Sequence, residues 1–523
     1  MAQHGELEKG LGGLLEGGPK PWIQIGAQMH DHPMLLAEIS AKKFYYDAKT
    51  LVDTIAEVSG YYQLDMLNAW GDNYNVEIEA LGGRMIYGEK SMPTIDFREP
   101  LIKEPEDLRK LKLKVKEVDW YKDGRIPFAF DIINYCQEYG TNMGIFTAPF
   151  SMAVGMRSFP RLAKDMRKRP EFAHELFTFI MDDILMPYIQ AQQDYCDIIY
   201  ALGPDAWAAV PNLSVKEMKE WVVPYNLEVT KKAKKFGVMA MCASGDYCEE
   251  RLEKFDTEVL QGCFDVMIES QGAPVISLGM GRWHEYPLES VREYTAKYWE
   301  QGKKATISAS INARLLRDGP VEKIVNTIKR YIDTFARDHN LSIFLVNIPA
   351  DTPPEHVHAA VAATHTYGHL PIADNLDEID FELPYKKSFK EWKQNPKPFS
   401  KTEVRKGLAG LLWQQMEPVN TIKEFKENYK DKTLKILYNL TDQKYGALIT
   451  VENGKLDVKH VLTDRETLEN LEVDASMACT AELFFNFGSM SKISALFKMF
   501  TGKLKLKNAK KMKEFGEIMA YVS

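Results

Sequence analysis

Two histidines separated by one residue, His30 and His32, are the side chains whose type and spacing best suit chemistry. An imidazole can bind a transition metal, move a proton near neutral pH or hydrogen-bond a substrate. Cys242, with Asp246 or Glu269, could complete a metal site if the fold brings these groups across from the histidines. Two histidines at this spacing reach one ion only from an extended or looped backbone. Hydrogen bonding to a substrate and plain packing are therefore open alternatives to metal binding.

The elements that must position these groups follow a regular alternation. Between about Trp22 and Leu370, short apolar segments rich in β-branched residues alternate with longer helical patterns, which is typical of βα units and a parallel sheet. Eight segments read as strands, the number that closes a barrel: 22–28, 64–71, 142–149, 196–203, 238–244, 264–270, 304–311 and 342–349. The predicted fold class of this part is α/β, a (β/α)8 barrel.

Polar and aromatic side chains follow several of these strands, where a parallel barrel has its mouth. They are Asn68, Trp70 and Asp72 after the second strand, Asp205 and Trp207 after the fourth, Asn312 after the seventh and Asn347 on the eighth. Aromatic walls with a few carboxamides and carboxylates describe a pocket for a neutral ring, such as a methoxylated aromatic. The alternative is that Trp70 and Trp207 only plug the top of the barrel.

The composition excludes several classes of protein. The 523 residues carry 66 Lys+Arg against 74 Asp+Glu, a formal net charge of −8, so no overall positive field exists to hold nucleic acid or an anionic membrane. No stretch approaches the roughly 18 uninterrupted apolar residues of a spanning helix. The six cysteines are scattered without a C-x-x-C pair. We expect free thiols and a cytoplasmic protein with no membrane span.

The pattern changes towards the C-terminus, which predicts a second domain. Residues 375–400 are charged and interrupted by prolines, as in a linker. Beyond them, 435–442, 445–454, 456–461 and 473–480 read as antiparallel strands, with Asn453-Gly454 as a hairpin turn. We therefore predict a barrel domain at 1–374, a linker at 375–400 and a smaller α+β domain at 401–523.

Several segments of the first domain, in order, resemble the uroporphyrinogen decarboxylase superfamily. They are VEIEALGGRMIY (76–87), GIFTAPFSMAVGMR (144–157), VVPYN (222–226), ISASINARLLRDGPVEKI (307–324) and IPADTPPEHVHAAVAA (348–363). The resemblance covers nearly all of residues 20–370 and implies a TIM barrel whose site lies at the C-terminal mouth of the strands. It also implies a tetrapyrrole decarboxylase or a methyltransferase that exchanges methyl groups with a corrinoid protein.

Two departures from the family pattern bear on this choice. A decarboxylase of a substrate with many carboxylates needs guanidinium groups at the mouth, yet residues 20–34 contain no arginine. The family's zinc methyltransferases carry His-x-Cys-Gly on the fifth strand and a cysteine on the eighth. Here only Cys242 is kept on the fifth strand, and Val346 stands at the eighth-strand position. The usual zinc triad is incomplete, so zinc would need a different set of ligands.

The tail from about Lys401 resembles the sterol carrier protein type 2 domain. The segments that carry this resemblance are LITVENGKLDV (448–458), AELFFNFGSM (481–490) and FKMFTGKLKLKNAKKM (497–512). Such a domain encloses an apolar tunnel, which implies a lipid-like or other hydrophobic ligand. The alternative is a domain kept only for packing or dimerisation.

Together these features predict a methyltransferase that moves a methyl group from a small hydrophobic donor to the cobalt of a corrinoid protein. The implied cofactor is cob(I)alamin or methylcobalamin on that partner, with zinc as a further candidate. Candidate catalytic residues are His30, His32 and Asp72, which would polarise the leaving oxygen, and Cys242 is a candidate metal ligand. Two alternatives are a carrier of lipids or other hydrophobic ligands with a degenerate barrel, and a decarboxylase of a less charged acid.

Overall fold

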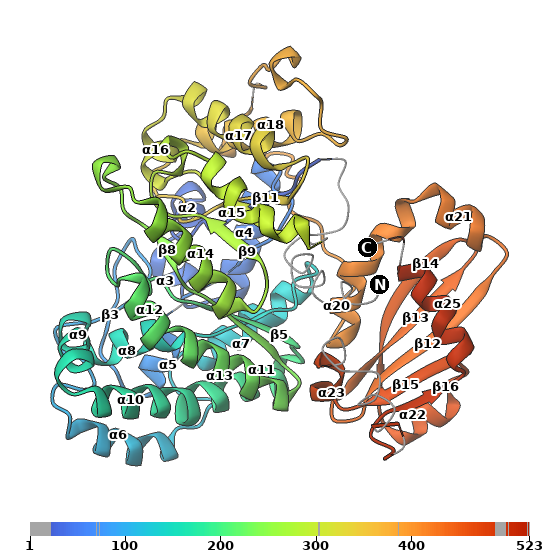
Figure 1. Ribbon diagram of the computed structural model, residues 1–523, viewed down its shortest axis with the longest axis horizontal. Helices are drawn as coiled ribbons and strands as arrows, with labels where there is room; N and C mark the ends of the chain where they lie inside the picture. The colour runs from blue at the N-terminus through green and yellow to red at the C-terminus, as the bar shows by residue number, and fades with distance from the viewer. Residues whose placement is uncertain are drawn as a thin grey trace.

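The computed structural model describes residues 22–523 except for 70, 73, 302–303, 385, 487–497, 500, 520 and 522–523. An α/β region and a smaller α+β region lie side by side (Figure 1). One cluster of buried hydrophobic residues runs from Ile23 to Phe389, and a second runs from Leu408 to Ile518 with Ile199 added from the first region. No helix among the described residues is long and apolar enough to cross a membrane.

Parallel strands of the N-terminal region form two hydrogen-bonded sheets, in the orders β1-β11-β10-β9 and β4-β5-β7. The strands are β1 (Ile25–Ala27), β4 (Gly144–Ile145), β5 (Tyr200–Pro204), β7 (Met239–Ala243), β9 (Val275–Leu278), β10 (Thr306–Ala309) and β11 (Asn340–Leu345). Among the described residues, no backbone hydrogen bond joins β7 to β9 or residues 64–69 to β4. The parallel α/β architecture agrees with the prediction, but the wall is open where a closed eight-stranded barrel was expected.

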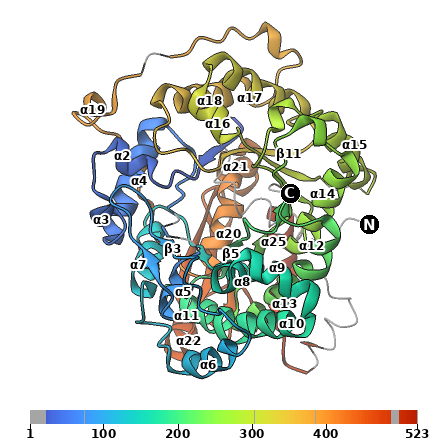
Figure 2. The ribbon, with the colours of Figure 1, turned by 90° about the vertical axis from the view of Figure 1, so that its left-hand side faces the viewer.

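Helices surround the two sheets in a ring (Figure 2). The longer helices are α4 (Ala48–Tyr62), α7 (Ile126–Gln137), α10 (Pro170–Phe179), α11 (Met186–Cys196), α13 (Val223–Ala233), α14 (Thr257–Gln271), α15 (Glu289–Glu300), α17 (Val321–Phe335) and α18 (Pro354–Tyr367). The shorter ones are α2 (His32–Leu36), α3 (Ala41–Phe44), α5 (Val76–Ala80), α6 (Asp107–Lys114), α8 (Pro149–Arg157), α9 (Phe159–Lys168), α12 (Val215–Trp221) and α16 (Ala313–Asp318). Two small sheets pair β2 (Met85–Ile86) with β3 (Thr94–Ile95) and β6 (Ala209–Val210) with β8 (Asp246–Tyr247).

Two of the predicted strands are wrong. Residues 64–69 form no strand. The Ile25 N–H of β1 donates to the Asp65 carboxylate at 3.0 Å, whereas in a regular parallel ladder it would donate to a backbone carbonyl of the neighbouring strand. Residues 264–270 lie in α14, which Asp256 caps at its N-terminus and Gly272 ends at φ 69°. The strand at that place in the sequence is β9, a few residues later. A short apolar run alone does not distinguish a buried strand from a buried helix face.

The C-terminal region has one five-stranded sheet in the order β14-β13-β12-β15-β16. Its strands are β12 (Thr433–Leu440), β13 (Tyr445–Glu452), β14 (Lys455–Leu462), β15 (Ala475–Cys479) and β16 (Lys505–Lys507). Its helices are α20 (Leu408–Met416), α21 (Lys423–Tyr429), α22 (Arg465–Asn470), α23 (Ala481–Phe485) and α25 (Ala509–Met519). The strands pair antiparallel except β12 and β15, which are parallel, so the sheet is mixed where a purely antiparallel one was expected.

The C-terminal region packs against the N-terminal ends of β4, β5 and β7, which we call the floor of the barrel. The Lys406 ammonium pairs with Asp197 at 2.7 Å, just before β5, and Gln414 of α20 donates to the Gly140 carbonyl at 2.9 Å, just before β4. The segment 375–400, predicted as a linker, runs over the barrel with α19 (Phe389–Trp392), and its Phe389 is buried in the first core. The floor is therefore an interface between the two regions.

Candidate active site

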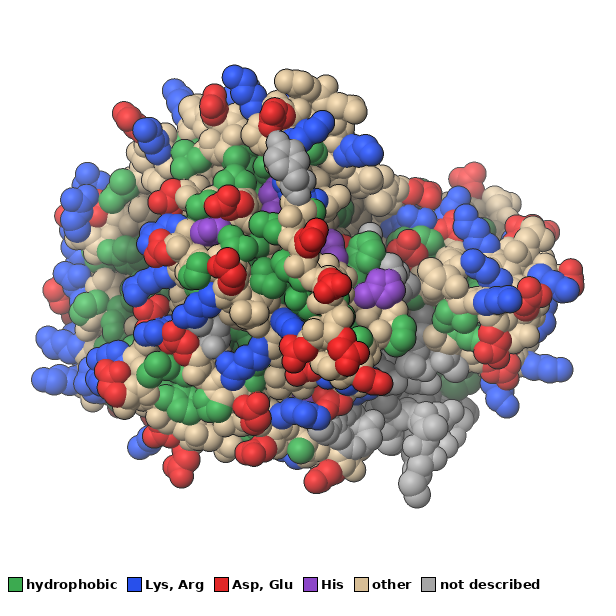
Figure 3. Space-filling view, turned by 90° about the horizontal axis from the view of Figure 1, so that it is seen from above, with side chains coloured by type: hydrophobic (Ala, Val, Ile, Leu, Met, Phe, Trp, Pro, Cys, Tyr) green, Lys and Arg blue, Asp and Glu red, His purple; other side chains and the backbone are tan. Residues whose placement is uncertain are grey.

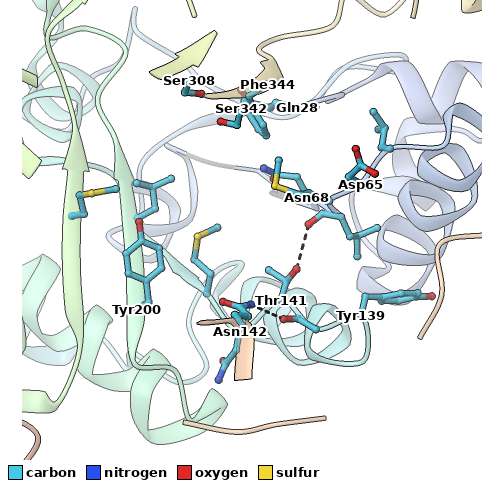
Figure 4. A pocket seen from close by; sticks show the side chains of 18 of the residues that line it. Gln28, Asp65, Asn68, Tyr139, Thr141, Asn142, Tyr200, Ser308, Ser342 and Phe344 are labelled. Carbon is cyan, nitrogen blue, oxygen red and sulfur yellow. Dashed lines mark hydrogen bonds between the residues drawn. The ribbon is translucent and has the colours of Figure 1, made fainter. Parts of the chain in front are cut away.

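A cavity of about 1270 Å³ lies between the two sheets and extends from one end of the barrel to the other. Figure 4 shows side chains from both sheets pointing into it. Its upper end is lined by residues that lie near the C-terminal ends of the strands: His30, Asn68, Tyr74, Asp205, Asp246, Met280 and Asn347. The described lining residues include one arginine and one lysine, Arg405 and Lys455, and both belong to the C-terminal region at the other end. The upper end, which we call the mouth, is therefore acidic and amide-bearing.

Two carboxyl groups, Asp205 and Asp246, face the cavity at the mouth. Asp205 accepts the Ser151 N–H and the Ser244 hydroxyl, each at 2.8 Å, and the Asn226 side chain supports Ser244 from behind at 2.8 Å. Burial raises the pKa of Asp205, and the hydrogen bonds from Ser151 and Ser244 lower it. Burial is the larger effect, so the pKa is raised to about 6. The position of Asp205 is therefore fixed by its neighbours.

Asp246 makes no hydrogen bond or ion pair through its carboxyl group with any other described residue. Burial, and next the neighbouring charge of Asp205, raise its pKa to about 6. Near neutral pH a fraction of this carboxyl group is protonated, and because no other described residue holds it, it can donate its proton to a bound substrate. Asp246 thus has the properties of a general acid that touches the cavity.

His30 and Asn347 form a hydrogen-bonded pair on the opposite side of the mouth. The distance from His30 Nε2 to Asn347 Oδ1 is 2.9 Å, so Nε2 carries the proton and donates it to the amide oxygen. Burial lowers the pKa of His30, which keeps the ring neutral. Its Nδ1 is then an acceptor, and it is buried without a hydrogen-bond partner, as is Oδ1 of Asn68. Buried polar atoms in this state favour binding of a ligand that satisfies them.

The backbone at this pair is strained. His30 has φ 42° and Asn347 has φ 56°, and both lie in the left-handed region that residues other than glycine seldom adopt. Such conformations cost on the order of 1–3 kcal/mol and persist where the surrounding structure holds them in place. The backbone conformation that directs these two side chains into the cavity therefore lowers the stability of the fold.

Two of the predicted catalytic residues lie away from the cavity wall. His32 is the first residue of α2, where its ring contacts the Ala350 carbonyl at 3.1 Å and the Tyr62 hydroxyl at 2.7 Å. Asp72 is buried against Arg125, with Oδ2 and Nε 2.5 Å apart, and burial raises its pKa to about 6 despite that positive charge. Both residues support the loops that carry the site and do not face it.

Some of the predicted substrate-binding residues line the cavity, and others do not. Asn68, Asp205 and Asn347 line the cavity. Asn312 caps α16 through its side-chain oxygen and donates to the Gly281 carbonyl at 3.0 Å. Trp207 stacks on Phe159 with ring centroids 5.6 Å apart and is absent from the cavity wall. Trp70 lies outside the described residues.

Cys242 is fully buried and packs in the main core, not on the cavity wall. On β7 its neighbours Met241 and Ala243 face the cavity, and the alternation of a strand directs the intervening side chain to the helices. No group of three His, Cys, Asp or Glu side chains in the described part of the chain is arranged to hold a metal ion. The donor set expected for zinc is therefore not assembled by His30, His32 and Cys242.

Comparison with known proteins identifies the family. The family model described as Uroporphyrinogen decarboxylase (URO-D) matches residues 19–367, well over half of the chain. This chain belongs to the URO-D family. The N-terminal region is therefore of the TIM-barrel type, and the mouth described above is the end at which URO-D and other TIM-barrel proteins place their sites.

Solved structures agree at the level of the fold. A methyltransferase from Methanosarcina mazei matches with a TM-score of 0.51 and 15% identity, over 69% of this chain and 98% of that chain. The sec-alkylsulfatase Pisa1 from Pseudomonas sp. matches with a TM-score of 0.16 and 12% identity, over 44% of this chain and 29% of that chain, too low to support a structural argument. No curated protein matches the chain.

Proposed function

We propose that this URO-D family protein is a methyltransferase that takes a methyl group from an uncharged, largely apolar donor and passes it to the cobalt of a corrinoid protein. The observation that carries the proposal is the mouth of the cavity, where two carboxyl groups have raised pKa values and where no arginine or lysine is found among the described residues that line the mouth. A porphyrinogen with many carboxylates would meet like charges there, whereas an ether such as a methoxylated aromatic would not.

The chemistry assigns one task to Asp246. In transfer from a methyl ether, the carbon–oxygen bond breaks, the methyl group goes to the Co(I) of the corrinoid, and the oxygen leaves with the bonding electrons. That oxygen needs a proton, which the protonated Asp246 carboxyl supplies, becoming a carboxylate. Asp205 cannot turn towards the substrate as readily, because Ser151 and Ser244 hold both of its oxygens.

His30 and Asn347 orient the donor in this proposal. A neutral His30 presents its unpartnered Nδ1 as an acceptor, and Asn347 fixes the ring through Nε2. His32 and Asp72 hold the adjoining loops and take no part in the reaction itself. No step is assigned to zinc, because the described histidine, cysteine and carboxylate side chains do not converge on a metal site.

We also propose a hydrophobic ligand for the C-terminal region, which is supported only by the resemblance of its segments to a sterol carrier protein type 2 domain. A carrier function without catalysis and a decarboxylase of a less charged acid are the competing assignments. The assay described next distinguishes each of these two assignments from the methyltransferase.

The test uses the full chain with photoreduced free cobalamin and a panel of methoxylated aromatics. We expect a donor-dependent change from the Co(I) to the methyl-Co(III) absorption spectrum, with free phenol released in equal amount. Asp246→Asn should slow this change by about 100-fold, the lower range for loss of a general acid. Glu258→Gln, which changes an exposed carboxylate on α14, is the matched control and should leave the rate unchanged.

The opposing outcomes are distinct. Release of CO2 from a panel of aromatic acids without cobalamin would replace the proposal by a decarboxylase. Binding of the donors without any cobalt methylation would replace it by a carrier.

A further inference from the structure

The interior of the barrel is hollow because small side chains stand where a TIM barrel usually has large ones. Ser277 of β9, Ser308 of β10 and Ser342 of β11 occupy equivalent positions in the register of the three strands. All three line the cavity. They form one row of hydroxyl groups across the sheet, which we call the serine row.

The serine row has no hydrogen-bond partners among the described residues. None of its three hydroxyl groups bonds to another side chain or backbone group there, although each can donate one hydrogen bond and accept two. Ser342 is buried, with 7% of its surface exposed, and Ser277 and Ser308 are partly exposed to the cavity. Hydroxyl groups at such a depth are satisfied by water or by a ligand.

The opposite wall is apolar. Tyr200 and Leu202 of β5 and Met241 of β7 form a small hydrophobic cluster separate from both main cores. Figure 4 shows Tyr200 across the cavity from Ser308 and Ser342. A molecule between the two sheets therefore meets a largely apolar surface on the β5–β7 side, and the three hydroxyl groups together with Phe344 and Val346 on the other.

The cavity continues through the floor. Gly140, Thr141 and Asn142 line it beside the start of β4, and Gly410, Leu411 and Trp413 of α20 line it beyond. In Figure 2, α20 lies behind the centre of the ring of helices. On β11 alone, the residues that line the cavity run from Ser342 to Val346, which spans roughly 13 Å at about 3.3 Å per residue, and the floor adds to this length. The space is thus long as well as large, and its volume exceeds the roughly 300–1,000 Å³ of a site for a drug-sized ligand.

We propose that the whole length of the barrel interior is a binding site for an elongated, uncharged, largely apolar molecule with an oxygen function part-way along it. The oxygen function bonds the serine row, the chain lies on the Tyr200–Leu202–Met241 wall, and the molecule enters through the floor beside α20. This assignment goes beyond the proposed methyl transfer, because it adds the interior below the mouth and the floor to the binding site and requires no corrinoid.

The first experiment is calorimetric titration of the full chain with linear primary alcohols from hexanol to dodecanol. Affinity should rise about fourfold for each added methylene through the series. Ser308→Phe, which fills the middle of the interior, should remove this rise beyond the shortest members. Ser342→Leu serves the same purpose if the phenylalanine variant does not fold, as judged by circular dichroism.

Two further variants test the oxygen contact and the entrance. Ser308→Ala should weaken binding of 7-tridecanone, a ketone with its oxygen at mid-chain, about fivefold, the effect of one hydrogen bond, with little change for dodecanol. Thr141→Trp at the floor should slow association of the long alcohols, whereas Thr178→Trp, at an exposed position of α10, should not.

Some results would overturn the proposal. One is that the affinity for alcohols stops rising at the same short chain length in the wild type and in Ser308→Phe. The other is that Thr141→Trp leaves the association rate of the long alcohols unchanged. Since no methyl acceptor is present, these failures are separate from a failure of methyl transfer.

Discussion

Replacing Asp246 by asparagine should stabilise the protein while removing its proposed proton donor. The carboxyl group has an ordinary pKa of 3.8 and a folded-state pKa of about 6, raised first by burial and then by Asp205. A folded-state pKa above the unfolded one means that the folded protein binds more protons between these values, so its stability falls as pH rises through this window. At about 1.36 kcal/mol per unit, the ionised group costs the fold at most about 3 kcal/mol above pH 7.

An amide at this position would keep the shape of the side chain without the charge, so the gain from Asp246→Asn depends on pH. The variant should be more stable than the wild type by about 3 kcal/mol at pH 8, by roughly half of that at pH 5, and by less than about 1 kcal/mol at pH 4. The measurement is the free energy of unfolding from urea titrations followed by circular dichroism at these three pH values.

Asp205→Asn is the comparison variant. Its carboxyl group has a similar pKa, but it accepts two hydrogen bonds that an amide with one oxygen cannot both replace. We therefore expect a smaller gain than for Asp246→Asn. A stability difference for Asp246→Asn that is the same at pH 4 and pH 8, or that is negative at pH 8, would refute the electrostatic reasoning. In the enzymatic assay, the wild-type rate should fall as pH rises through about 6, because the acid is lost.

Five other variants, in three comparisons, test features of the described structure. Asn347→Ala should be about 1 kcal/mol less stable than Asn347→Gly in urea titrations, because both lose the bond to His30 and only glycine tolerates φ 56° freely. Arg157→Ala should cost about 3 kcal/mol or more, since Arg157 is buried against Asp165, whereas Arg169→Ala should cost under about 1 kcal/mol because Arg169 is 38% exposed; equal losses would contradict this. Cys242→Ala should leave the zinc content of the purified protein, measured by elemental analysis, unchanged, and a loss of bound zinc would restore Cys242 as a ligand.

The sequence predicted the alternation of strands and helices and the strand ends that carry the site. His30, Asp205 and Asn347 follow or end predicted strands and do meet at the mouth. It could not predict which way a side chain points after a strand ends, because the loop conformation decides this. His32 begins a helix and Asp72 pairs with Arg125 for that reason, although both are close in sequence to residues of the site.

The serine row was missed for a different reason, although its signal was present. In 304–311 and 342–349 a serine lies among β-branched and apolar residues at alternate positions, which marks a polar side chain on the inner face of a strand. The register that aligns the three serines depends on pairing between distant strands, and sequence pattern alone does not fix it. The role of Asp246 as an unpartnered acid likewise depends on burial and on its neighbour Asp205.

The open wall of the barrel has a mechanical consequence. In a closed barrel, the number of strands and their stagger set the diameter. On the face shown in Figure 3, charges of both signs are interspersed. Inside the barrel, one sheet carries the serine row, and the other carries the Tyr200–Leu202–Met241 wall. Because no backbone hydrogen bonds tie the described edges β7 and β9 together, the two halves can separate without breaking a ladder. At this seam the width of the interior is therefore set by side-chain packing, chiefly that of α14, which contacts both strands, and not by a closed ladder.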